Sequence, residues 1–146
     1  MKVAIASDHG GFALKQDILK TLQELGVEYQ DFGCYNEASV DYSDYGIKVG
    51  EAVASKEFDR GILICGTGIG ISIAANKVKG VRCALVHDLF SAQATRAHND
   101  SNVLAMGGRV VGPGLATEIV KVWLSTEFEG DRHVARIEKI SKYENA

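Results

Sequence analysis

Apolar positions along the chain follow two alternating patterns. Short runs of aliphatic and β-branched residues are separated by longer stretches in which apolar residues recur every three or four positions. The short runs predict strands, and the longer stretches predict amphipathic helices. The predicted strands are Val3 to Ala6, Glu28 to Phe32, Gly61 to Cys65, Val81 to Val86 and Val103 to Met106.

The first predicted helix has the clearest pattern. Phe12, Leu14, Ile18, Leu22 and Leu25 recur at helical spacing, and Gly26 is placed to end the helix. After it, a second helix is expected to start with Ser43 as its N-cap and to run through Val53, a third to follow Gly70, and a fourth to occupy Leu89 to Ala97.

Two further helices are predicted after the last strand. Gly112-Pro113 is an N-cap and first-turn signal. Asp131 is expected to open the final helix. The expected apolar stripes are Leu115, Ile119, Val122 and Trp123 on the first of these helices, and Val134, Ile137 and Ile140, turned inward, on the second.

Strands that alternate with helices predict right-handed βαβ crossovers and an all-parallel sheet covered on both faces. The strands of such a sheet should be apolar almost throughout. We therefore expect a single doubly wound, Rossmann-like α/β/α sandwich over residues 1–146, with a five-stranded parallel sheet and a C-terminal helix. Ligands in such folds bind beyond the carboxyl ends of the strands.

Composition and charge narrow the function classes. The chain is 46% hydrophobic and 24% charged, as in ordinary globular proteins, and its formal net charge of -3 argues against a general nucleic-acid partner. Uninterrupted apolar runs such as Ile62 to Cys65 are far too short for a membrane span, and no secretory signal pattern follows Met1. A cytoplasmic protein without a membrane partner is expected.

The strand that ends at Cys65 runs directly into a glycine-rich turn and then a helix. Alternating glycines at 66, 68 and 70 allow backbone N–H groups to converge on an anion at the helix N-terminus. A P-loop would need a Gly-Lys-Ser/Thr ending, and a dinucleotide fingerprint would need glycine at 71 or 73, where the chain has isoleucine. A tight turn without a ligand is the alternative.

Cys65 stands just before that helix, where the N–H groups and the helix dipole favour the thiolate. It is therefore a candidate base or nucleophile, although a small buried apolar side chain is the alternative. Cys34 and Cys83 lack the glycine context and are expected to be structural. The odd number of cysteines and the absence of a CxxC pair predict three reduced thiols rather than disulfides or a zinc site.

The first predicted strand ends in Ser-Asp-His-Gly-Gly, at the same sheet edge as Cys65. Asp8 can accept hydrogen bonds from hydroxyl groups, and His9 can donate one to an oxyanion or phosphate. Asp8 can also cap the first helix, which is compatible with ligand binding.

Two histidines flank the fourth predicted helix. His98-Asn99-Asp100 follows it and should lie at the opposite sheet edge from Cys65, so a catalytic His98 would serve the site of a neighbouring subunit. A solvated polar loop is the alternative. His87-Asp88 begins the helix at the carboxyl edge and is either a cap or a contact at the rim of the site, and we favour the cap.

Arg132 and Arg136 are four residues apart on the final helix and therefore share a face. Two guanidinium groups one turn apart suit a phosphate, and Arg109 in its glycine-flanked loop is a further candidate. The alternative is a solvated basic face.

Together these residues resemble those of ribose-5-phosphate isomerases of type B, which belong to the sugar-phosphate isomerases that include galactose-6-phosphate isomerase subunits. The resemblance spans nearly the full length, through SDHGGFALK, VDYSDYG, ILICGTGIGISIAANK and NVLAMGGRVVG. It implies an aldose-ketose isomerase of the non-oxidative pentose phosphate pathway that interconverts ribose 5-phosphate and ribulose 5-phosphate through an enediolate. It also implies no metal or organic cofactor, and a homodimer with the site at its interface.

The resemblance assigns roles by position. Cys65 is the base rather than a glutamate after the turn, because position 71 is isoleucine. His98 opens the sugar ring, and Asp8 and Thr67 handle hydroxyl protons. The implied binding residues are Gly66, Gly68, Ile69 and Gly70 for the enediolate oxygen, Tyr42 and Asn99 for the sugar, and His9, Arg109, Arg132 and Arg136 for the phosphate.

Galactose-6-phosphate isomerase divides its site between two different subunits, whereas this chain carries the complete set, which favours a homo-oligomer. The alternatives are an isomerase of another aldose phosphate, such as allose 6-phosphate or galactose 6-phosphate, a nucleotide-binding regulatory module, and a hydrolase with Cys65 as nucleophile.

Overall fold

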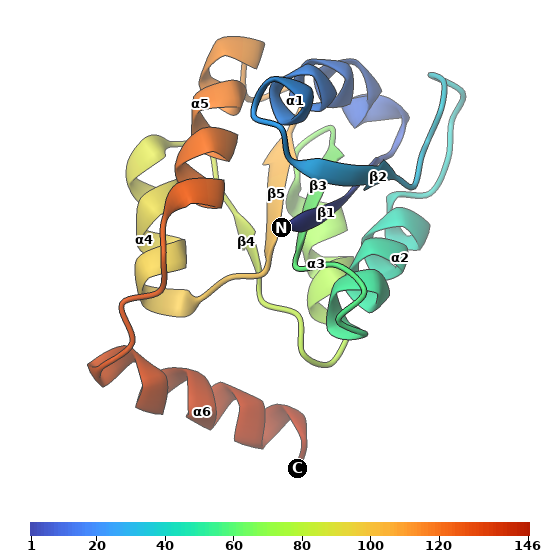
Figure 1. Cartoon of the computed structure of the whole chain (residues 1–146). Helices are drawn as coiled ribbons and strands as arrows, with labels where there is room; N and C mark the ends of the chain where they lie inside the picture. The colour runs from blue at the N-terminus through green and yellow to red at the C-terminus, as the bar shows by residue number, and fades with distance from the viewer.

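The computed structural model describes all 146 residues, and its centre is a parallel five-stranded sheet in the order β2-β1-β3-β5-β4 (Figure 1). The doubly wound fold predicted from the sequence is confirmed. The chain adds strands first on one side of β1 and then on the other, so the topological switch point lies between β1 and β3. The strands are β1 (Lys2–Ser7), β2 (Glu28–Asp31), β3 (Arg60–Cys65), β4 (Cys83–Leu85) and β5 (Val103–Gly107).

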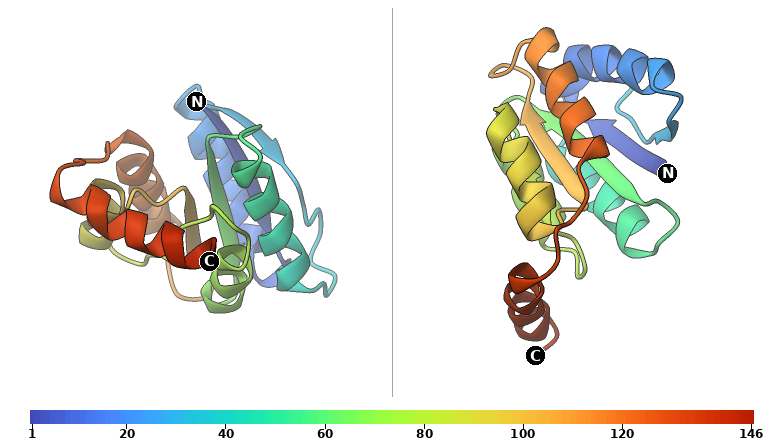
Figure 2. Two further views of the ribbon diagram at one scale, coloured as in Figure 1. Left: turned by 90° about the horizontal axis from the view of Figure 1, so that it is seen from below. Right: turned by 60° about the vertical axis from the view of Figure 1, so that its left-hand side comes forward.

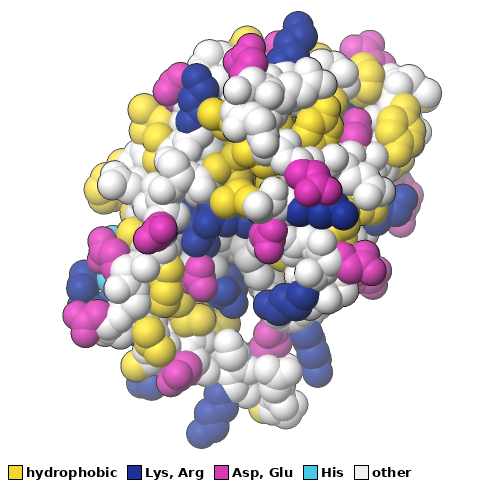
Figure 3. Space-filling model, viewed as in Figure 1, with side chains coloured by type: hydrophobic (Ala, Val, Ile, Leu, Met, Phe, Trp, Pro, Cys, Tyr) yellow, Lys and Arg dark blue, Asp and Glu magenta, His cyan; other side chains and the backbone are white.

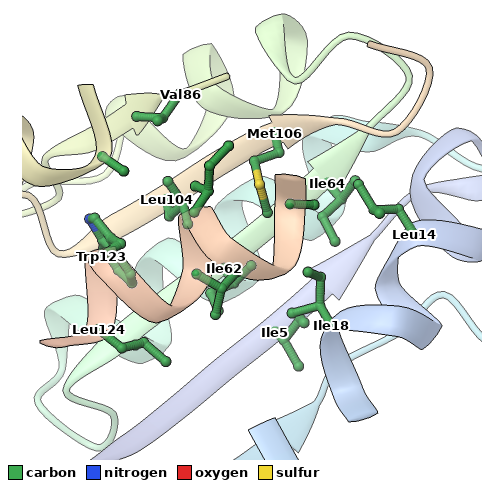
Figure 4. Close-up of a cluster of buried hydrophobic side chains, with 14 of the residues drawn as sticks. Ile5, Leu14, Ile18, Ile62, Ile64, Val86, Leu104, Met106, Trp123 and Leu124 are labelled. Atoms are coloured by element: carbon green, nitrogen blue, oxygen red, sulfur yellow. The ribbon is translucent and has the colours of Figure 1, made fainter. Parts of the chain in front are cut away.

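Helices cover both faces of the sheet. One face packs against α1 (Phe12–Glu24), α4 (Leu89–Asn99) and α5 (Pro113–Ser125), and Figure 4 shows side chains of this core around Ile62, Leu104 and Trp123. The other face packs against α2 (Tyr42–Ala54) and α3 (Ile69–Asn76). The remaining helices are a short 3₁₀ turn, η1 (His9–Gly11), and α6 (Arg132–Glu144).

The strand β2 differs from the expectation of apolar strands throughout. Its sequence Glu-Tyr-Gln-Asp alternates exposed and partly buried residues. The reason is its position, because an edge strand has one neighbour and less cover than the central strands, which are buried almost completely. A strand was predicted here and is present, but the expectation that it would be apolar was wrong.

Several helix ends also differ from the predicted ones. The helix α2 begins at Tyr42 after Asp41, so Ser43 lies inside it and is not the N-cap. The helix α3 begins at Ile69, before Gly70. Because α4 continues to Asn99, His98 and Asn99 form its last turn instead of following it. The start of α5 at Gly112-Pro113 is confirmed, but Leu115 is 42% exposed and does not belong to its buried stripe.

The final helix α6 extends away from the sheet and packs against the end of α4 (Figures 1 and 2). Val134 and Ile140 are 40% and 59% exposed, so the prediction that they turn inward was wrong. His133 is the buried residue of this helix. Its apolar side is therefore left largely uncovered by the chain's own core.

The surface carries charges of both signs. Figure 3 shows Lys and Arg side chains interspersed with Asp and Glu over the face seen in Figure 1. None of the helices combines the length and the apolar character required to cross a lipid bilayer.

Candidate active site

Three loops meet at the carboxyl edge of the sheet, at the switch point. Strands β1 and β3 are neighbours with Ser7 opposite Ile64, so Asp8 and Cys65 leave the sheet side by side. The backbone of Gly10 approaches that of Gly66 so closely that a Cβ on Gly10 would lie 3.1 Å from the Gly66 nitrogen. The third loop follows β5, which pairs with β3 up to Cys65 and Gly107.

Cys65 lies at the centre of these loops, and its side chain is 4% exposed. The backbone N–H of Gly68 donates a hydrogen bond to its Sγ at 3.1 Å. Gly68 is also the N-cap of α3, so the sulfur lies at the N-terminal end of a helix, where the helix dipole is positive. The structure thus provides the contact that the glycine turn predicted.

The turn depends on glycine at position 68. Its φ angle of 78° is in the left-handed region, and a Cβ there would lie 2.7 Å from the carbonyl carbon of Met106. The side chain of Tyr42 covers the same loop, because a Cβ on Gly70 would lie 2.6 Å from its ring. Tyr42 therefore lies against the glycine turn.

Arg109 belongs to this group of loops rather than to the arginines of α6. The N–H groups of Gly108 and Arg109 donate to the carbonyl oxygens of Cys65 and Gly66 at 2.8 and 3.0 Å. A Cβ on Gly66 would lie 3.2 Å from an Arg109 guanidinium nitrogen. The positive charge of Arg109 therefore lies next to the glycine turn.

The loop after β1 supplies a carboxylate and an imidazole. Asp8 is buried, and its Oδ1 accepts a hydrogen bond from the Gly11 N–H at 3.1 Å, so the predicted capping role is present in η1. His9 accepts one at Nδ1 from the Val40 N–H at 3.2 Å. A neutral imidazole that accepts at Nδ1 carries its proton on Nε2, which leaves that nitrogen as a donor.

The other predicted residues lie elsewhere. His98, at the end of α4, stacks on His133 of α6 with ring centroids 4.5 Å apart. With Asn99 and Arg136, these histidines line a cavity of about 680 Å³ between α6 and the start of β4, and no residue of the Cys65 loop lines it. Within one chain, the predicted site is thus divided into a Cys65 group and a His98 group.

The residues of the Cys65 group come from the three loops, α2 and the start of α3, and those of the His98 group from α4 and α6. The Cys65 group consists of Asp8, His9, Tyr42, Cys65, Gly66, Thr67, Gly68, Ile69, Gly70 and Arg109. The His98 group consists of His98, Asn99, Arg132 and Arg136.

Comparison with known proteins identifies the family. The model of the Ribose/Galactose Isomerase family matches residues 3–140. The chain belongs to this family. It is 51% identical to ribose-5-phosphate isomerase B of Escherichia coli, over 98% of this chain and 96% of that protein. It is 42% identical to the D-erythrulose-4-phosphate isomerase of Pectobacterium atrosepticum, over 99% and 96%.

Solved structures of the family agree with the fold. Ribose-5-phosphate isomerase B of Clostridium thermocellum has a TM-score of 0.98 and 54% identity, covering 99% of this chain and 98% of that one. The Mycoplasma genitalium enzyme with bound ribulose-5-phosphate has a TM-score of 0.95 and 42% identity, covering 99% and 96%.

In this family member, a histidine outside the predicted set supports the third loop. Asp88 caps α4 through the Ser91 N–H at 2.7 Å, as interpreted from the sequence, and this bond holds the pKa of Asp88 below its usual range. His87 has a different contact, because its Nε2 accepts the Gly107 N–H at 3.0 Å. The sequence carried no signal for it, since the partners are 20 residues apart and meet only across β4 and β5.

Gly68→Ala is expected to destabilise the protein and remove activity. The left-handed backbone alone costs about 1–2 kcal/mol for a residue with a Cβ. The Met106 carbonyl, being backbone of a central strand, cannot move aside. Thermal unfolding should show a lower Tm. Gly114→Ala is the matched control, because open space surrounds Gly114, and it should leave the Tm unchanged or higher.

Proposed function

We propose that the protein is an aldose-ketose isomerase that interconverts ribose 5-phosphate and ribulose 5-phosphate. The observation that carries the proposal is the Cys65 sulfur held by the Gly68 N–H within a glycine turn at the switch point of the sheet. The names of relatives with full-length similarity support the same reaction and substrate. The proposed place of action is the cytoplasm, where phosphorylated sugars are metabolised.

The proposed chemistry is a proton transfer through an enediolate. The Cys65 thiolate removes the proton from C2 of the open-chain aldose, and negative charge moves onto O1. The same thiol then returns a proton to C1, while Asp8 and Thr67 move the hydroxyl proton from O2 to O1. A base positioned in this way contributes about 10²–10⁴-fold to the rate.

Backbone donors of the glycine turn stabilise the charge on the enediolate oxygen. The turn from Gly66 to Gly70 presents N–H groups at the start of α3, next to the sulfur. Preorganised donors of this kind are worth about 2.7–4 kcal/mol each in the transition state. Arg109, beside Gly66, and the Nε2 donor of His9 bind the phosphate at the outer end of the substrate.

The proposed site is completed by a second copy of the chain. The His98 group lies away from the Cys65 group of its own chain, and α6 has uncovered Val134 and Ile140. Apolar side chains are also exposed next to the glycine turn, at Ile69, Ile73 and Leu85. In a twofold dimer, each chain would bring His98, Asn99, Arg132 and Arg136 to the Cys65 group of its partner.

Arg136→Ala is expected to raise the KM for ribose 5-phosphate by about 10–100-fold, because a hydrogen bond to a charged group is worth about 1.5–3 kcal/mol. The effect should be confined to phosphorylated sugars. Lys139→Ala is the control, since it removes the same charge from another exposed position on α6. Steady-state kinetics measure kcat and KM for both variants. If Arg136→Ala raised the KM for unphosphorylated ribose by the same factor, Arg136 would not act by binding the phosphate.

The reaction itself is tested by a proton NMR time course with ribose 5-phosphate in D₂O, without added metal. Ribulose 5-phosphate should appear with deuterium incorporated from solvent. The relative that is an erythrulose phosphate isomerase makes a panel of aldose and ketose phosphates the necessary comparison. If the protein converts another sugar phosphate but not ribose 5-phosphate, the proposed isomerisation stands and the proposed substrate is wrong.

A further inference from the structure

The last turn of α4 carries two residues of the His98 group and ends in an unusual backbone conformation. His98 and Asn99 form this turn, and Asp100 follows it with φ and ψ angles of 46° and 45°, in the left-handed region. Most residues with a Cβ avoid this conformation, although aspartate tolerates it better than others. The direction in which the turn presents His98 and Asn99 therefore depends on contacts that hold Asp100 in place.

Arg82, which precedes β4, holds the end of this turn from outside the helix. Its Nε donates to the carbonyl oxygens of Asn99 and Asp100, at 3.1 Å each, and its Nη2 donates to the Asp100 carbonyl at 2.8 Å. The same Nη2 lies 3.4 Å from a carboxylate oxygen of Asp100. One planar guanidinium group thus binds two consecutive carbonyl oxygens and a carboxylate, which the single ammonium group of a lysine cannot do in this geometry.

Arg96 binds the other carboxylate oxygen of Asp100. Its Nη1 donates to that oxygen at 2.9 Å and to the carbonyl oxygen of Ser101 at 2.6 Å, and its Nε donates to the Thr126 carbonyl at 3.2 Å. The Arg96 side chain is 7% exposed, so its charge needs these partners. Asp100 therefore lies between two guanidinium groups, one from its own helix and one from the sheet side.

The backbone of Arg82 is fixed to the sheet. Its N–H donates to the Asn102 side-chain oxygen at 2.7 Å, and its carbonyl oxygen accepts the N–H groups of Asn102 and Val103 at 3.1 and 3.3 Å. Val103 is the first residue of β5, an inner strand of the sheet. Arg82 thus connects the rigid sheet to the turn that carries His98.

We propose that Arg82 is a positioning residue, which together with Arg96 and Asp100 fixes the last turn of α4 so that His98 and Asn99 reach the active site of a second copy of the chain. This role rests on the proposed function, in which both residues act beside the Cys65 group of the partner. A shift of the turn would displace both from the substrate, and a misplacement of about 1 Å can cost about 10²-fold in rate.

The hold on the turn is measured first, by amide hydrogen exchange and without reference to activity. The N–H groups of Asp100 and Ser101 donate to the carbonyl oxygens of Arg96 and Thr95 at 3.3 and 3.2 Å. In Arg82→Ala, these two N–H groups should exchange about tenfold faster or more, while those of β5 should not change. Lys79→Ala, which removes an exposed charge from the connection before Arg82, should leave the turn as it is. Unchanged exchange in Arg82→Ala would overturn the proposal.

Steady-state kinetics give the effect on the reaction. Arg82→Ala should lower kcat for ribose 5-phosphate by about 10–100-fold and change KM little, because the arginines proposed to bind the phosphate are intact. Lys79→Ala should keep the wild-type kcat. If Arg82→Ala does not fold, Arg82→Lys replaces it, since it keeps the charge but cannot span both carbonyl oxygens. A wild-type kcat in the folded variant would overturn the positioning role.

Mixed dimers show to which group of residues the defect belongs. In a dimer of Arg82→Ala and Cys65→Ala chains, the intact Cys65 meets a partner with an undisturbed His98 turn, so about half of the wild-type kcat should return. In a dimer of Arg82→Ala and His98→Ala chains, neither chain has an undisturbed His98 turn, so activity should not exceed that of Arg82→Ala. Recovery in the second dimer would assign Arg82 to the Cys65 group, and recovery in neither would indicate general damage to the fold. Either result would overturn the proposal.

The dimer of Cys65→Ala and His98→Ala chains separates this proposal from the proposed function. If that dimer stays inactive although the wild type is active, the shared site fails. If the wild type has no isomerase activity, the proposed reaction fails. In both cases the exchange measurement still decides whether Arg82 holds the turn.

Discussion

Cys65→Ala is expected to lower kcat for ribose 5-phosphate by about 10²–10⁴-fold, the usual contribution of a positioned general base. The Cys65 sulfur accepts the Gly68 N–H within the glycine turn, and it is the proposed base. The phosphate contacts are on other residues, so KM should change little. Loss of kcat with KM preserved is the sign of an interaction made in the transition state.

The measurement combines steady-state kinetics with solvent exchange. In D₂O, the wild type should exchange the C2 proton of the substrate during turnover, and Cys65→Ala should lose exchange and turnover together. A variant that keeps exchange but loses turnover would assign proton removal to another residue. Retention of turnover would remove Cys65 from the base role.

Cys83→Ala is the matched control. Burial raises the pKa of the Cys83 thiol to about 12, so this cysteine remains protonated at neutral pH and cannot act as a base. Cys83 lines the cavity of the His98 group, but its thiol takes no part in the proposed proton transfer, so the substitution should leave kcat within a factor of about two. Cys65 and Cys83 thus differ in the local backbone, not in their chemical group.

The sheet and its switch point could be predicted from the sequence because buried strands and amphipathic helices have different apolar periods. The same reasoning predicted a glycine turn between the strand that ends at Cys65 and the next helix, and the structure has this turn at the start of α3. The prediction was least accurate where the position of an element in the fold, and not its own sequence pattern, determines which of its residues are buried. The polarity of β2 follows from its place at the edge, which no local period encodes.

The supporting contacts of the site were beyond sequence reasoning. Val40 donates to His9 across 31 positions, and His87 accepts from Gly107 across 20. Both are bonds between a backbone N–H and an imidazole, so only one partner has a distinctive side chain. Such pairs carry no spacing rule, and they become visible only when the strands bring them together.

The prediction for the final helix was correct about the helix and wrong about what its apolar residues pack against. Val134, Ile137 and Ile140 have the spacing of a buried stripe, and the prediction placed them against the chain's own core. The helix does form, but Val134 and Ile140 remain exposed. An amphipathic stripe that its own chain does not cover is consistent with a surface that a second subunit covers.

Complementation between two inactive variants tests the shared site directly. Cys65→Ala and His98→Ala should each be inactive alone. When the two are mixed and allowed to exchange subunits, activity should return to about a quarter of the wild-type value, because half of the dimers are mixed and each has one intact site of two.

The recovery of activity depends on which chain supplies each residue of a site. In a mixed dimer, the subunit with Cys65 meets the partner subunit that retains His98, while the second site carries both substitutions. If Cys65 and His98 of one chain acted together, each chain in the mixture would still lack one of the two groups, and activity would stay absent. Co-expression with two affinity tags provides the mixed dimer in pure form, which should show about half of the wild-type kcat per dimer.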